Sequence, residues 1–149
     1  MAIVRASLSL NSADVLTSAL ALTTVANLTC DSGSLIRAKV KGTAADSNDL
    51  AVYVANQCSD RAYLYIKNME AELENYIYIH NDTDSGFSTT GVTGSQDVSP
   101  LVAKVGGGEF AFIPVAADKK YEVYATKVDS LIEYGVFGND NSDAPYGGS

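Results

Sequence analysis

The side chain best suited to acid–base chemistry in this sequence is His80, its single histidine. A serine hydrolase would pair it with an acid and with a nucleophilic serine in a sharp turn, yet no serine lies in the GxSxG pattern of such a turn. Glu109 has no acidic partner at a spacing suited to glycoside chemistry, although folding could bring one close. We therefore expect no enzyme, and a hydrolase that uses His80 or Glu109 is the least favoured function.

Metal and cofactor ligands are equally sparse. One histidine and two distant cysteines, Cys30 and Cys58, do not make a zinc site. The run DTDSG at 82–86 resembles the start of a calcium loop, but it lacks the third acid, the correctly placed glycine and the closing glutamate. The glycines at 106–108 lack the Lys-Ser/Thr of a phosphate loop, so they predict a turn. We expect no metal and no cofactor.

The cysteines also bear on the compartment. Cys30 and Cys58 form no CxxC motif and no framework of the kind found in small secreted proteins, which favours free and partly buried thiols and leaves their pairing open. The apolar stretch 15–28 is interrupted by threonines and preceded by Asp14, which argues against an export signal and against a membrane span. Synthesis in the cytoplasm is the expectation.

Any site must be positioned by the secondary structure of the chain, and residues 61–80 lie at the centre of that structure. Segments 61–67 and 75–80 both alternate with period two, and a short acidic segment joins them, which predicts an antiparallel hairpin. In the natural register Tyr63 lies opposite Tyr78, Tyr65 opposite Tyr76, and Leu64 opposite Ile77. The four tyrosines then share one face and the aliphatic residues share the other. The tyrosine face either meets an opposing sheet of the same chain or contacts another subunit.

The rest of the chain repeats the strand pattern. A second hairpin is predicted from 101–105 and 109–115 across the three glycines, with Phe110 and Phe112 on one face. The sequence predicts about nine or ten short strands and no useful helix, so the expected fold is an all-β antiparallel sandwich, jelly-roll-like. Residues 1–138 are expected to form one domain, and 139–149 a flexible polar tail.

Charge limits the partners. The net charge is −8, and residues 68–103 hold six acids and no Lys or Arg. Such a surface repels phosphate, so we expect neither nucleic acid nor a membrane as a partner.

Several segments together carry a family resemblance. RAYLYIKN at 61–68 with YIYI at 76–79, LVAKVGGGEFAFIP at 101–114 and IEYGVF at 132–137 resemble the small β-rich virion proteins of tailed bacteriophages. Such proteins serve as capsid cement or decoration subunits, or as minor tail and fibre components. The resemblance covers about half of the chain and brings no catalytic residue with it.

The resemblance implies a non-enzymatic protein of the virion, made in the host cytoplasm, that cements the capsid by binding the major capsid protein and itself. A homotrimer is expected, because a capsid lattice offers three-fold positions. Exposed aromatic faces would supply the contacts, since many weak contacts sum in a lattice. The alternative is a receptor- or carbohydrate-binding module of a phage tail. The expected interface residues are Tyr63, Tyr65, Tyr76, Tyr78, Phe110 and Phe112.

Overall fold

A computed structural model of the chain describes residues 2–13, 19–30, 32–42, 50–82, 101–125 and 129–140. The described residues form eleven strands and no helix, and every strand pairing is antiparallel. The strands are β1 (Ala2–Ser12), β2 (Leu20–Cys30), β3 (Ser32–Gly33), β4 (Ile36–Val40), β5 (Leu50–Tyr53), β6 (Cys58–Asn68), β7 (Ile77–Asp82), β8 (Leu101–Val105), β9 (Phe110–Ala116), β10 (Lys120–Ala125) and β11 (Ser130–Asp140). The predicted all-β sandwich is confirmed.

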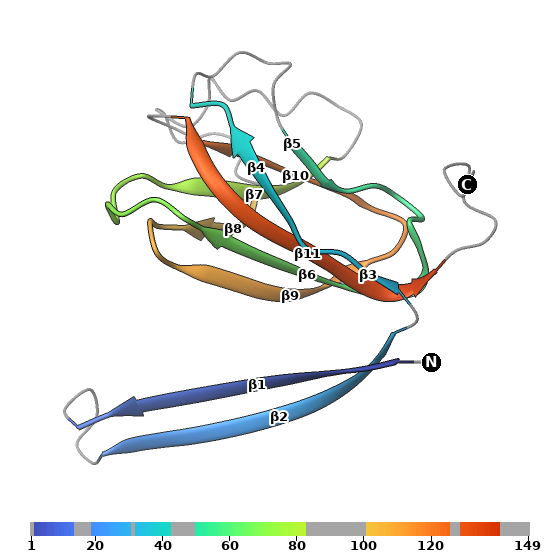
Figure 1. Ribbon diagram of the computed structural model, residues 1–149, viewed down its shortest axis with the longest axis horizontal. Helices are drawn as coiled ribbons and strands as arrows, with labels where there is room; N and C mark the ends of the chain where they lie inside the picture. The colour runs from blue at the N-terminus through green and yellow to red at the C-terminus, as the bar shows by residue number, and fades with distance from the viewer. Residues whose placement is uncertain are drawn as a thin grey trace.

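Two sheets form the sandwich. One runs β3-β11-β6-β9, with β4 also paired to β11, and the other runs β5-β10-β7-β8. Figure 1 shows the two sheets stacked, with β11 and β6 across the middle of the nearer layer. The core lies between them, because alternate residues of the strands that face each other are aliphatic.

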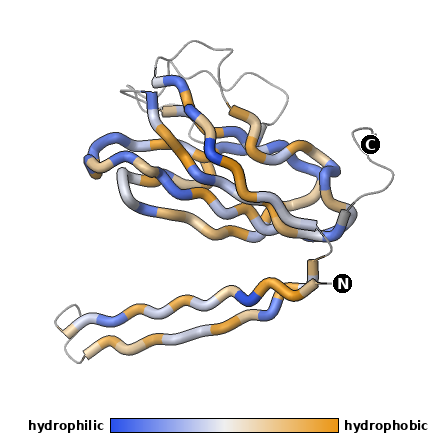
Figure 2. The backbone as a smooth tube through the Cα atoms, in the orientation of Figure 1, coloured by the Kyte–Doolittle hydropathy of each residue, from blue (hydrophilic) through white to orange (hydrophobic). Residues whose placement is uncertain are grey.

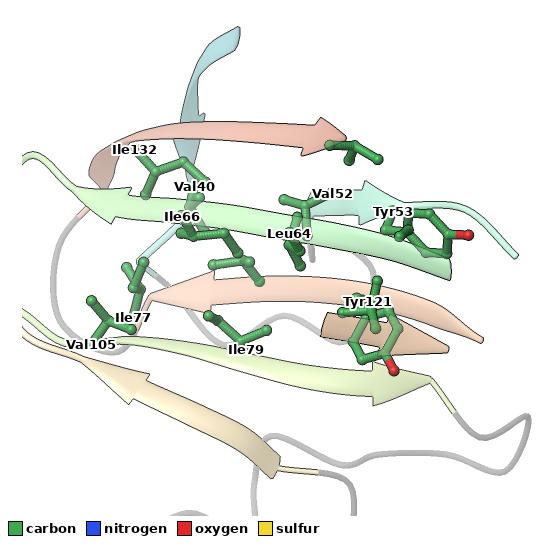
Figure 3. Packing of buried hydrophobic residues seen from close by; sticks show 14 of the residues in the cluster. Val40, Val52, Tyr53, Leu64, Ile66, Ile77, Ile79, Val105, Tyr121 and Ile132 are labelled. Carbon is green, nitrogen blue, oxygen red and sulfur yellow. The ribbon is translucent and has the colours of Figure 1, made fainter. Parts of the chain in front are cut away.

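The centre of the core comes from β6 and β7. Leu64 and Ile66 of β6, and Ile77 and Ile79 of β7, are all fully buried. Figure 3 shows these four side chains meeting in the space between the two sheets. The predicted division of each strand into an aliphatic and a tyrosine face is therefore correct.

The predicted hairpin between 61–67 and 75–80 is wrong. β6 pairs with β11 and β9, whereas β7 pairs with β10 and β8 in the other sheet. The chain crosses from one sheet to the other through residues 69–76. The physical reason is that each aliphatic face covers the other when the strands lie in opposite sheets, whereas a hairpin would leave both faces on the same side and uncovered.

The predicted hairpin of 101–105 with 109–115 fails in the same way. β8 belongs to the four-stranded sheet and β9 to the five-stranded sheet, so the glycine turn joins the two layers. Gly108 has a φ of 79°, which an L side chain rarely adopts. The turn prediction itself is correct.

The first two strands form a sheet of their own. β1 and β2 pair from Ala2 opposite Cys30 to Ser12 opposite Leu20. Figure 1 shows this hairpin (blue) extended alongside the sandwich and joined to it at the Cys30 end. Figure 2 shows apolar residues recurring along the whole length of both strands.

The end of the chain and the long polar segment are only partly described. β11 continues to Asp140, and residues 141–149 of the expected tail lie outside the described residues. Residues 83–86 of the calcium-like run also lie outside them.

Candidate functional site

The structure divides the expected interface residues between two surfaces. Tyr63 and Tyr65 lie on the outer face of the five-stranded sheet, because their neighbours Leu64 and Ile66 point into the core. Tyr76 and Tyr78 belong to the side of the molecule formed by the other sheet. The single four-tyrosine face expected from the sequence is therefore wrong, since it depended on the hairpin.

Phe110 and Phe112 join the first surface. Phe112 is the register partner of Tyr65, and its ring stacks on that of Tyr63 with the centroids 5.8 Å apart and the planes within 3°. Phe110 is 60% exposed and Phe112 36%. Four of the six expected residues thus form one partly exposed aromatic surface, made of Tyr63, Tyr65, Phe110 and Phe112.

The second aromatic group is more enclosed. Tyr78 stacks on Tyr124 with the centroids 5.1 Å apart, and the His80 ring lies 5.6 Å from Tyr124. The Nζ atom of Lys104 sits 3.7 Å from the centroid of the Tyr76 ring, which is a cation–π contact. His80 is only 1% exposed, so it is a buried part of this packing.

The other residues considered for chemistry have structural roles. The Glu109 carboxylate accepts a hydrogen bond from the Gly106 N–H at 2.7 Å, so it holds the glycine turn. Cys30 and Cys58 are both buried and carry thiols. No group of three or more His, Cys, Asp or Glu that could hold a metal ion occurs in the described part of the chain. Within the same residues there is no helix of the length and hydropathy that crossing a membrane requires.

The hairpin has one apolar and one polar face. Register partners share a face, so Val4, Leu28, Leu10 and Leu22 all point the same way. The apolar face consists of Ala2, Val4, Ala6, Leu8, Leu10, Ser12, Leu20, Leu22, Thr24, Ala26, Leu28 and Cys30. The opposite face consists of Ile3, Arg5, Ser7, Ser9, Asn11, Ala21, Thr23, Val25, Asn27 and Thr29.

Burial of the apolar face changes along the hairpin. At the end joined to the sandwich, Leu28 is 8% exposed and Cys30 is 2% exposed. The tip is the end of the hairpin at which Ser12 lies opposite Leu20. Towards this tip, Leu8, Leu10 and Leu22 are 41%, 43% and 45% exposed. The same face is therefore covered at the base and open at the tip.

A groove of about 770 Å³ separates this face from the sandwich. One wall comes from the hairpin and includes Val4, Ala6 and Leu8. The other comes from the outer face of the five-stranded sheet, with Tyr65, Phe110, Phe112, Glu133 and Phe137, and from Leu35 in the link between β3 and β4. The groove is a mostly apolar cleft between two sheets.

The one acid in the groove wall is already paired. Glu133 accepts a hydrogen bond from Arg37 Nε at 3.0 Å as an ion pair, and one from the Tyr65 hydroxyl at 3.5 Å. Burial, and then the nearby Glu133 carboxylate, raise the pKa of Tyr65 above its usual value, so the phenol stays neutral at ordinary pH. The sandwich wall of the groove thus presents aromatic rings and the Glu133 carboxylate, whose charge is balanced by Arg37.

The hairpin was not predicted as a functional element. In the sequence, residues 2–10 alternate with period two, and residues 21–29 are a threonine-rich strand candidate. The missing step was to align them, because only their register shows that the leucines of both strands fall on one face.

The comparisons with known proteins find a similar fold among solved structures. No protein-family model matches the chain, and no curated protein matches it. Among solved structures, a similar chain is described in the words "Bacillus endospore appendages form a novel family of disulfide-linked pili". The two chains are 17% identical with a TM-score of 0.47, and the alignment covers 75% of this chain and 95% of that one.

This finding corrects the resemblance to small virion proteins of tailed bacteriophages, because the similar chain is a spore appendage protein. Capsid cement and the phage tail module are withdrawn as functions. The major capsid protein as partner, the virion as location and the homotrimer on a capsid lattice are withdrawn with them.

Proposed function

We propose that this chain is a structural subunit that associates with copies of itself and has no catalytic role. The observation that carries the proposal is the apolar face of the β1–β2 hairpin, which is open at the tip. A two-stranded hairpin is only marginally stable in water unless a third strand or another layer covers it. Each of these strands is 11 residues long, so the tip has much to gain from a partner.

The charge distribution supports a second copy as that partner. Residues 1–30 carry one positive charge, Arg5, and one negative charge, Asp14, so the net charge of −8 resides in the rest of the chain. Two copies of the chain therefore repel each other over most of their surfaces. The hairpin is the part through which two copies can touch with the least repulsion.

In this proposal residues 1–138 act as one structural unit, which β11 extends to Asp140, and the rest of the expected 139–149 tail follows it. The aromatic surface of Tyr63, Tyr65, Phe110 and Phe112 lies beside the hairpin on the same side of the sandwich. It therefore contributes to self-association, whereas Tyr76 and Tyr78 lie on the opposite side.

The test compares two serine substitutions on β2. Leu22→Ser removes an exposed apolar side chain from the apolar face, and Val25→Ser removes an equally exposed one, also 45%, from the polar face. We expect sedimentation velocity and electron microscopy to show that the natural chain assembles. The loss of one buried leucine should weaken assembly roughly tenfold or more for Leu22→Ser and leave Val25→Ser unchanged.

Two results would contradict the proposal. The first is a natural chain that stays monomeric at every concentration tested. The second is equal behaviour of the two variants, which would mean that the apolar face is not the contact surface.

A further inference from the structure

The groove lies between the hairpin and the sandwich, and apolar side chains from both line it. Leu28 and Cys30 are buried at the base of the hairpin, whereas Leu8 on one wall of the groove and Phe110 on the other are exposed at its open end. Figure 1 shows that the start of β9, which holds Phe110, lies towards the same end of the molecule as the hairpin tip. The open end therefore offers apolar walls on both sides.

The hairpin of the same subunit cannot fill this groove, because that hairpin is one of its walls. Only residue 31 separates β2 from β3, and β3 is fixed by its pairing with β11, so the base of the hairpin is held close to the sandwich. The groove, of about 770 Å³, is open to solvent, so it leaves mostly apolar walls exposed that a partner could cover.

The charge pattern selects the occupant. The groove walls are mostly apolar, and their polar members are Arg5, Ser7, Thr24 and Glu133, which pairs with Arg37. An apolar element with little charge therefore gives up less solvation on entering the groove than the acidic surface of the sandwich would. The hairpin tip is an apolar, nearly uncharged element of this chain, with Leu10 opposite Leu22 and Leu20 beside them. Its leucine side chains are apolar, as are the rings of Tyr65, Phe110 and Phe112 in the groove wall.

Given the self-association proposed above, on which this step rests, we infer that the hairpin tip of one subunit enters the groove of the next. The residues that insert are Leu10, Leu20 and Leu22, and none of them lines the groove that receives them. Such a contact is heterologous, so each subunit keeps one free tip and one free groove. Assembly continues until a ring closes or a fibre forms.

Complementation tests this inference. Leu10→Asp damages the tip and leaves the groove walls intact, because Leu10 is not part of them. Phe110→Asp damages the groove and leaves the tip intact. Each variant alone should associate roughly a hundredfold more weakly than the natural chain, since a carboxylate replaces a buried apolar side chain. An equimolar mixture should form heterodimers, because one intact tip meets one intact groove.

Val102→Asp is the matched control. Val102 is 43% exposed on β8, in the other sheet, so its substitution should leave assembly unchanged. Thermal melting of each variant reports folding, and Phe110→Ser replaces Phe110→Asp if the latter melts early.

The outcomes separate the two proposals. A natural chain that never assembles defeats the proposed function itself. If the Phe110→Asp or Phe110→Ser variant assembles as well as the natural chain, the groove is not the receiving surface. That result would support a contact between hairpins alone. Two defective variants whose mixture stays monomeric defeat the head-to-tail arrangement.

Discussion

Tyr53 shows how a single buried polar group is satisfied. Its ring is fully buried and meets Tyr121 edge-on, with the centroids 6.0 Å apart. Its hydroxyl donates a hydrogen bond to the Ala117 carbonyl at 3.1 Å and accepts one from the Cys58 N–H at 3.3 Å. The phenol therefore ties together the ends of three segments, at 53, 58 and 117.

Burial raises the pKa of Tyr53 to about 12. An unfolded tyrosine titrates near pH 10, so the folded chain holds this proton more tightly than the unfolded chain. The stability that depends on the neutral phenol is complete below about pH 10. It is lost as the pH rises towards about 12.

We predict that Tyr53→Phe lowers the free energy of unfolding at neutral pH and flattens its fall between about pH 10 and 12. The loss at neutral pH should be about 1–3 kcal/mol, because the Cys58 N–H and the Ala117 carbonyl lose their partner. Denaturant titrations of both chains across this pH range measure the effect. Parallel curves for the two chains would show that the Tyr53 phenol is not responsible.

At the scale of elements, two segments carry the chain from one sheet to the other: residues 69–76 and the glycine turn at 106–108. Each helps to hold the other in place. Asn68 is fully buried at the end of β6, and its Nδ2 donates to the carbonyls of Asn75 at 2.7 Å and Val105 at 3.2 Å. Its Oδ1 accepts from the Glu70 N–H at 3.1 Å. One amide thus holds both the 69–76 crossing and the end of the strand before the glycine turn.

Gly107 fits against the same crossing. A Cβ at this position would lie 2.2 Å from the carbonyl oxygen of Glu72, which is backbone, so one of the two segments would have to move. Close approach of the two crossings therefore requires glycine here.

We predict that Asn68→Ala lowers the free energy of unfolding by about 3 kcal/mol, because three backbone groups, one buried and two part-buried, lose their partner. Asn27→Ala is the control, since Asn27 is exposed on the polar face of the hairpin and should change stability by less than about 0.5 kcal/mol. Chemical denaturation measures both. A similar small effect of the two substitutions would contradict the role given to Asn68.

Alternation in the sequence was enough to find β6 and β7 and their two faces. It identified Leu64, Ile66, Ile77 and Ile79 as one kind of surface, and all four are in the core. It did not identify strand partners, because a period of two reports only which face a side chain takes. Consecutive strands were assumed to pair, whereas β6–β7 and β8–β9 each cross the core.

The candidate site was only half predictable for the same reason. Phe110 and Phe112 alternate visibly, but their place beside Tyr65 depends on β9 pairing with β6, a partner distant in sequence. The groove depends in turn on how the hairpin lies over that sheet, and no local pattern encodes such packing.

At the scale of the whole molecule, charge and hydropathy are divided between two parts. The hairpin is almost uncharged and apolar on one face, and the remaining chain carries the net charge of −8. When two copies associate, the burial of apolar surface favours the contact, and the repulsion between their acidic surfaces opposes it. Repulsion of this kind weakens as salt screens it.

We predict that salt strengthens assembly. Raising the ionic strength from about 0.01 M to about 0.1 M shortens the Debye length from about 30 Å to about 10 Å, which reduces repulsion between the bodies. The dissociation constant from sedimentation should fall, and Leu22→Ser measured alongside gives the background from non-specific association. A dissociation constant that rises with salt would indicate a contact held by ion pairs.

The short link between β2 and β3 has a mechanical consequence. Tension on the hairpin passes through residue 31 to β3 and from there to β11, which pairs with β6 over most of its length. β3 pairs with β11 at only two positions, whereas β4, which follows it in the chain, pairs with β11 at five. A pull on the hairpin therefore loads the short β3 pairing first, and a string of such subunits would begin to yield there.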